Sequence, residues 1–116
     1  MQSWEKKAIL FKALGDPTRV RIMEMLCSSG ALCVSAIAER IGARQPTISQ
    51  HLKILKSCGL VSSSRQGFRI HYRIDGKKLE ELHRMVLGFA DSRGGKRADS
   101  SCPDGPVHAP GDAPPS

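Results

Sequence analysis

Residues 34–57 have the sequence VSAIAERIGARQPTISQHLKILKS, which predicts two short helices joined by a tight turn. The first helix is expected over residues 34–41, because apolar side chains recur there at the spacing of one helix face: Val34, Ile37, Ala38 and Ile41. Gly42 suits the turn, since glycine adopts backbone conformations that other residues avoid. The residue that caps this first helix is left open between Cys33 and Ser35.

The second helix of the pair is expected from Gln45 to Ser57, with Pro46 in the first turn, where a missing N–H costs nothing. Its apolar side chains define a core face: Ile48, Leu52 and Leu55. The opposite face is polar and its side chains are mostly small. The motif also needs a small residue where the helices approach, a glycine in the turn and an apolar anchor in the second helix. Ala38, Gly42 and Ile48 supply these at the spacing typical of a helix-turn-helix, so the stretch predicts that motif.

The flanking sequence predicts a hairpin after the motif and further helices on both sides. Residues 60–65 and 69–74 read as strands joined at Gln66-Gly67. Helices are expected over about residues 3–14, 17–27 and 77–92, and the second of these has its inward side chains at Val20, Ile22, Met23 and Leu26. The predicted fold class is mainly α with a small β-hairpin, a winged helix-turn-helix of order α-α-α-α-β-β-α.

Acidic residues are absent from residues 40–74, which carry seven basic ones: Arg40, Arg44, Lys53, Lys56, Arg65, Arg69 and Arg73. Like charges repel within a compact protein, so a segment of one sign indicates a partner of the other sign. An anionic membrane is one such partner, but no apolar run approaches the ~20 residues of a spanning helix. A basic helix-turn-helix with a hairpin favours double-stranded DNA.

The charge and composition also divide the chain. Residues 1–93 hold 16 Lys and Arg against 8 Asp and Glu, a net charge of +8, and are predicted to form a winged helix-turn-helix domain for DNA binding and dimerisation. Residues 94–116 contain five of the seven prolines and few large apolar side chains, so they are predicted to be a disordered Pro/Gly-rich tail. The N-terminus lacks the pattern of a signal peptide, which predicts a cytoplasmic protein.

The segment from Ser49 to Val61, followed by Arg65-Gln66-Gly67 and Tyr72, resembles the ArsR/SmtB family of winged-helix repressors. The upstream segment Leu14-Gly15-Asp16-Pro17-Thr18-Arg19 shares this resemblance, which covers about residues 5–90. It implies a repressor that binds an inverted-repeat operator on double-stranded DNA. The sequence contains no CxxC pair and no Gly-rich phosphate loop, so these motifs do not favour an enzyme as the alternative.

The second helix of such a motif enters the major groove with its N-terminal residues facing the base edges. Gln pairs with adenine, Lys donates to guanine, and hairpin Arg residues suit phosphates or the minor groove. The predicted DNA-binding residues are Arg44, Gln45, Thr47, Ser49, Gln50, Lys53, Lys56, Arg65 and Arg69. His51 is interpreted as structural, with a phosphate contact as the alternative. Two other interpretations stay open: these residues form an ordinary solvated face, or the winged helix serves only protein–protein assembly.

A single helix-turn-helix contacts little DNA, so a dimer with two recognition helices one DNA turn apart is predicted. The last helix has apolar residues at the 3-4-3 spacing of a coiled-coil seam, and the resemblance implies that the first and last helices build the homodimer. The predicted interface residues are Trp4, Ala8, Phe11, Leu79, Leu82, Val86 and Phe89. The alternative is that these side chains complete the core of one chain.

The four cysteines are candidates for metal or thiol sensing: Cys27, Cys33, Cys58 and Cys102. The resemblance implies release from DNA by a metalloid, a metal or a thiol-reactive effector, with As(III) or another thiophilic metal ion as the candidate; a member without a metal effector is the alternative. Leu32-Cys33-Val34 resembles the arsenic-responsive members, but Ser35 stands where their next cysteine ligand lies. Cys33 is favoured as reactive, because a helix N-terminus stabilises a thiolate, and Cys27 and Cys58 are expected to be structural.

Overall fold

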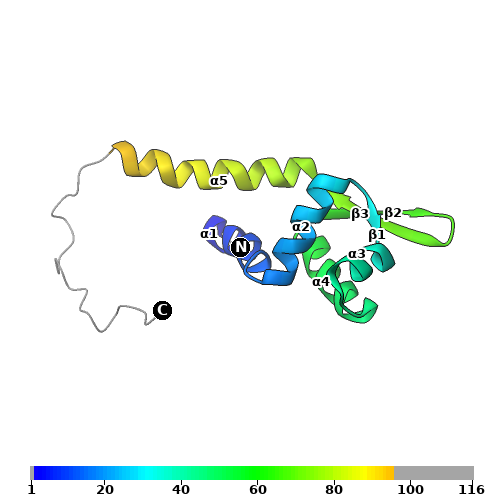
Figure 1. The fold of residues 1–116 in the computed structure, drawn as a ribbon. Helices are drawn as coiled ribbons and strands as arrows, with labels where there is room; N and C mark the ends of the chain where they lie inside the picture. The colour runs from blue at the N-terminus through cyan, green and yellow to red at the C-terminus, as the bar shows by residue number, and fades with distance from the viewer. Residues whose placement is uncertain (1, 96–116) are drawn as a thin grey trace, which may run out of the picture. The chain divides into compact units, whose positions relative to one another are not determined.

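The computed structural model describes residues 2–95 (Figure 1). Its elements are α1 (Ser3–Ala13), α2 (Pro17–Ser29), β1 (Leu32–Cys33), α3 (Val34–Ile41), α4 (Gln45–Ser57), β2 (Val61–Gln66), β3 (Arg69–Ile74) and α5 (Gly76–Gly95). Residues up to 86 form one compact unit, and the part of α5 from residue 87 onward belongs to a second unit. The mainly α winged helix-turn-helix is confirmed. The predicted tail begins at residue 94, but α5 extends to Gly95, and residues 96–116 lie outside the described residues.

The sheet has three strands in the order β1-β3-β2, where the sequence predicted only the hairpin. Strand β1 pairs antiparallel with β3, Leu32 opposite Tyr72 and Cys33 opposite His71. Two residues are too few to show the alternation that marks a strand, and β1 exists because the free edge of β3 supplies its hydrogen bonds. The corrected order of elements is α-α-β-α-α-β-β-α.

The core lies between the helix-turn-helix and the sheet. Its fully buried side chains are Ile22, Leu26, Ile37, Ile48, Leu52, Leu55 and Leu60. Two residues predicted to point inward do not, because Val20 is 39% exposed and Cys27 is exposed. Both lie roughly a quarter turn or more from the centre of the buried face of α2, since an α-helix turns about 100° per residue.

Local hydrogen bonds set the starts of the helices that carry the site. Asp16 caps α2, and its Oδ2 accepts from the backbone N–H groups of Thr18 at 2.9 Å and Arg19 at 3.1 Å. The N-cap residue of α3, which the sequence left open between Cys33 and Ser35, is Cys33. Gly42 ends α3 at φ 81°, in the left-handed region, and so turns the chain into α4. No helix within residues 2–95 has the length and apolar character needed to cross a membrane.

Candidate nucleic-acid interface

The outer face of α4 is open to solvent along its whole length. Ile48, Leu52 and Leu55 have no exposed surface and anchor the opposite face in the core. All nine predicted DNA-binding residues are exposed, and they lie on α4, at its N-cap and on the hairpin: Arg44, Gln45, Thr47, Ser49, Gln50, Lys53, Lys56, Arg65 and Arg69. The fold therefore presents these side chains, and their contact with DNA stays a prediction.

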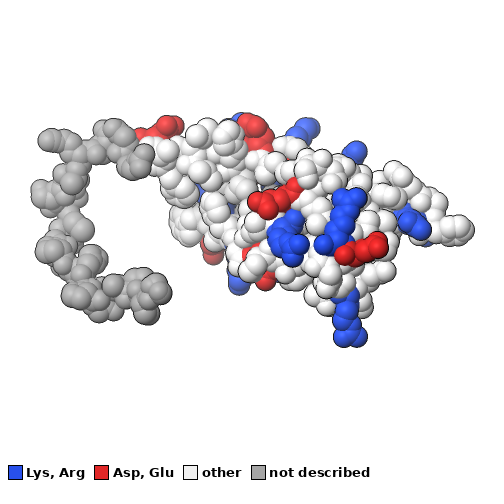
Figure 2. All heavy atoms as spheres, viewed as in Figure 1, with Lys and Arg blue, Asp and Glu red and all other residues white. Residues whose placement is uncertain are grey.

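Among residues 2–95, no carboxylate forms an ion pair with the cations of this face. Within residues 2–95 the ion pair of Lys78 with Glu81 spans 3.2 Å, and Nδ1 of His51 lies 3.8 Å from Oδ2 of Asp16, so none of the seven cations of residues 40–74 has an acidic partner there. On the face seen in Figure 2, the acidic groups lie over the helical body and none lies over the hairpin. The hairpin is held to the end of α4, because Lys56 Nζ donates to Ser63 Oγ at 2.7 Å.

His51 is part of a polar junction behind α4. Its Nδ1 lies 3.1 Å from Nη1 of Arg19, and its side chain is 18% exposed. A guanidinium can only donate, so Nδ1 of His51 is the acceptor in this contact. Arg19 also donates from Nε to the carbonyl of Ala13 at 2.6 Å. The junction ties the end of α1 and the start of α2 to the middle of α4, which agrees with the structural interpretation of His51.

A hollow of about 280 Å³ separates the start of α4 from the wing, the hairpin of residues 61–74. Its lining comes from the starts of α3 and α4 and from the wing: Cys33, Val34, Ser35, Gln45, Ser49, Phe68, Arg69 and Ile70. Three predicted DNA-binding residues therefore meet at one place. Phe68 and Ile70 are not among the predicted residues, and the only sequence signal for them is an aromatic residue placed directly after the turn glycine.

Cys33 is buried and is one of the residues that line this hollow. The hydroxyl of Ser35, 3.3 Å from Sγ, lowers the pKa of the Cys33 thiol, and the backbone N–H of Ala36 and the guanidinium of Arg69 add to the effect. The Nη1 of Arg69 lies 4.0 Å from Sγ. His71 lies across the sheet from Cys33, and its Nδ1 is buried without a hydrogen-bond partner among the described residues.

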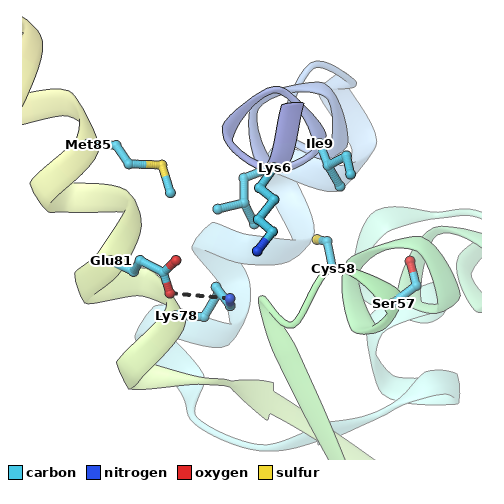
Figure 3. Close-up of a pocket in the computed structure, with 8 residues that line it drawn as sticks. Lys6, Ile9, Ser57, Cys58, Lys78, Glu81 and Met85 are labelled. Atoms are coloured by element: carbon cyan, nitrogen blue, oxygen red, sulfur yellow. Dashed lines mark ion pairs between the residues drawn. The ribbon is translucent and has the colours of Figure 1, made fainter. Parts of the chain in front are cut away.

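The other described thiols lie elsewhere. Cys27 is exposed on α2, so its predicted place in the core is wrong. Cys58 is half-buried at the end of α4, donates to the carbonyl of Leu55 at 3.4 Å, and faces a second hollow lined by Lys6, Lys78 and Met85 (Figure 3). Cys102 lies outside the described residues. Residues 2–95 contain no group of three or more His, Cys, Asp or Glu side chains that could hold a metal ion.

The predicted dimer residues fall into two classes. Leu82 is 9% exposed and belongs to the core, and Leu79 is half-buried against that core, so the alternative interpretation holds for these two. The remaining five are exposed: Trp4, Ala8, Phe11, Val86 and Phe89. The 3-4-3 spacing did not separate the classes, because a helix face that packs on its own core has the same period as one that packs on a partner.

Comparison with known proteins places this geometry in a family. The sequence profile described as "Bacterial regulatory protein, arsR family" matches residues 16–63. An HTH-type transcriptional regulator of Methanocaldococcus jannaschii is 41% identical over 86 residues, which cover 74% of this chain and 97% of that protein. The arsenical resistance operon repressor of Escherichia coli is 42% identical over 65 residues, 56% of each chain.

A solved structure agrees with these sequence matches. The homodimeric winged helix-turn-helix DNA-binding domain of a possible ArsR-family regulator from Mycobacterium bovis is similar with a TM-score of 0.63 and 34% identity. The match covers 84% of this chain and 89% of that domain. The sequence relatives, the profile and the shared winged helix-turn-helix all indicate the same family. The chain belongs to the ArsR family of bacterial transcriptional regulators.

Proposed function

We propose that the chain is a cytoplasmic repressor that binds an inverted-repeat operator as a homodimer, with α4 in the major groove and the wing on the flanking backbone and minor groove. One observation carries this proposal: α4 with its N-cap and the wing present six of the seven cations of residues 40–74, and none of them has a carboxylate partner within residues 2–95. Such a surface matches the charge of duplex phosphates.

Within that complex the residues have separate roles. Gln45 and Gln50 in the N-terminal half of α4, with Lys53 just past its middle, read base edges. Arg65 and Arg69 on the wing supply phosphate or minor-groove contacts, which set affinity more than sequence preference. The homodimer is supported by the assembly of the M. bovis domain and by the exposed apolar side chains of Trp4 and Val86.

We also propose that a thiol-reactive effector acts at Cys33. The E. coli relative is named for arsenical resistance, which supports a thiophilic effector. As(III) favours several thiolates, but the described thiols lie on α2, at the start of α3 and at the end of α4 and form no metal-binding group within residues 2–95. The described residues therefore do not fit a metalloid site, whereas Cys33 has a lowered pKa and lies beside Arg69.

The test is fluorescence anisotropy with a duplex that the chain itself selects from a random-sequence pool. The selected duplex is expected to contain an inverted repeat and to bind far more tightly than a scrambled one. Adding As(III), Cd(II), Zn(II) or an oxidant in separate titrations then identifies the effector, with Cys33→Ser compared against Cys27→Ser as the matched control. Equal affinity for selected and scrambled duplexes contradicts operator binding, and release that persists in Cys33→Ser contradicts the role of that thiol.

A further inference from the structure

Phe68 lies at the tip of the wing with its side chain 100% exposed. It is the second residue of the two-residue turn between β2 and β3, whose closing pair is Gln66 and Arg69. A phenyl ring in this position adds nothing to the core, and an exposed apolar side chain at the end of a hairpin favours aggregation. The fold alone gives no reason for an aromatic residue there.

The turn that carries Phe68 is well ordered by its own contacts. Gly67 has φ 66°, in the left-handed region that glycine adopts without strain. The Nε of Arg65 donates to the carbonyl of Gly67 at 3.4 Å, across the turn. Because the backbone beneath the ring is fixed by the ladder and by this bond, only the rotation of the Phe68 side chain itself has to be ordered when the ring meets a partner.

Phe68 lies at the wing end of the hollow beside the start of the recognition helix. It lines the hollow of about 280 Å³ together with Gln45 and Ser49 of α4. With α4 in the major groove, a projection beside its N-terminal end spans one sugar-phosphate strand and reaches the adjacent minor groove. The wing tip is therefore directed toward the same duplex as α4.

The charges around the ring fit that partner. Arg65 and Arg69 are exposed on either side of the tip, and residues 40–74 contain no carboxylate. The minor groove combines a negative potential, which attracts guanidinium groups, with base steps between which apolar side chains insert. A protein partner would need a broad apolar patch, but Ile70, at 43% exposed, is the only other exposed large apolar side chain of the described wing.

We propose that Phe68 is a wedge that inserts at a base step in the minor groove beside each half-site. This inference rests on the proposed operator binding and adds a specificity determinant to it. Partial unstacking is easiest at the flexible pyrimidine–purine steps TA and CA/TG. The chain would then prefer these steps at the wing position through DNA deformability, without a hydrogen bond to the bases.

Selection from a random pool tests the preference. The wild-type chain is expected to enrich TA or CA/TG steps at the wing position, and Phe68→Ala is expected to lose that enrichment while keeping the half-site read by α4. Phe68→Leu keeps an apolar wedge and is expected to retain the preference, while Gln66→Ala is a control on the same hairpin. Because Phe68 is wholly exposed, Phe68→Ala should keep the far-UV circular dichroism spectrum and melting temperature of the wild type.

A second measurement detects unstacking at the base step directly. With 2-aminopurine at the wing position, the wild-type chain should raise its fluorescence through unstacking, and Phe68→Ala should abolish the rise and weaken binding about 10-fold. If Phe68→Ala behaves as wild type while Gln50→Ala and Arg69→Ala lose affinity, the wedge is wrong and operator binding stands. If none of the three changes affinity, the proposed function itself fails.

Discussion

Nη1 of Arg19 donates a hydrogen bond to Nδ1 of His51 at 3.1 Å, which joins α2 to the recognition helix α4. The same guanidinium holds the carbonyl of Ala13 at the end of α1. His51 also lies 3.8 Å from the carboxylate of Asp16, the N-cap of α2. The recognition helix is thus positioned by a polar junction on its inner side as well as by the apolar anchors of its core face.

The junction predicts how stability depends on pH. The backbone N–H of Arg19 donates to the Asp16 carboxylate and holds its pKa below the ordinary value of 3.8. A lowered pKa in the folded state contributes stability above the unfolded value, and this is lost as pH falls from about 4 through the folded pKa. Asp16→Asn keeps a capping side chain but cannot titrate. In thermal melts, the wild type should lose stability below pH 4 more steeply than Asp16→Asn.

Glu24→Gln, an exposed carboxylate on the same helix, is the control for that comparison. Parallel melting curves for the wild type and Asp16→Asn across this pH range would show that the cap contributes no pH dependence.

Base reading by α4 predicts a loss of sequence-specific affinity. Gln50→Ala and Lys53→Ala should each weaken binding to the selected duplex by about 1–3 kcal/mol, because each removes a side chain placed to pair with a base edge. For Gln50→Ala, binding to a scrambled duplex should change much less, because this substitution removes no charge. Anisotropy titrations measure both, with Ser57→Ala at the far end of α4 as the control. Unchanged affinity in both variants removes these residues from the recognition set.

Phosphate contact by the wing predicts a different signature. Binding should fall linearly on a log–log plot against salt, with a slope of roughly −0.9 for each phosphate neutralised. Arg65→Ala and Arg69→Ala should each weaken selected and scrambled duplexes alike and reduce the slope by about 1. Titrations at several salt concentrations give these slopes, and a loss limited to the selected duplex would contradict the phosphate role.

The homodimer predicts that an exposed apolar side chain of α5 is covered in solution. Val86 is 48% exposed, and Val86→Glu should shift the chain to a monomer at micromolar concentration in sedimentation equilibrium, because a carboxylate would be buried at the interface. Val20, 39% exposed on α2, offers a matched control in Val20→Glu. A wild-type chain that sediments as a monomer contradicts the predicted interface.

The helix-turn-helix could be predicted almost to the residue because its signals are local. The N-terminal Pro46 and the three apolar anchors of α4 give its bounds, and they match the structure at Gln45–Ser57. The face that these anchors leave outward follows from the helical period alone, so the exposure of the predicted DNA-binding side chains was also predictable. The absence of acids across residues 40–74 is likewise a property of the sequence.

Other features were decided by contacts between residues far apart in the chain. Strand β1 exists only because β3 offers an edge, and the pairing of Cys33 with His71 follows from that register. Leu82 packs into the core rather than staying free for a partner, which its helical period cannot reveal. The sequence by itself determined the local helices and the sign of the charge on their surface, since both depend on residues that are near neighbours in the chain. Only the tertiary structure brought Arg69 and Phe68 of the wing beside the starts of α3 and α4, because long-range pairing positions that hairpin.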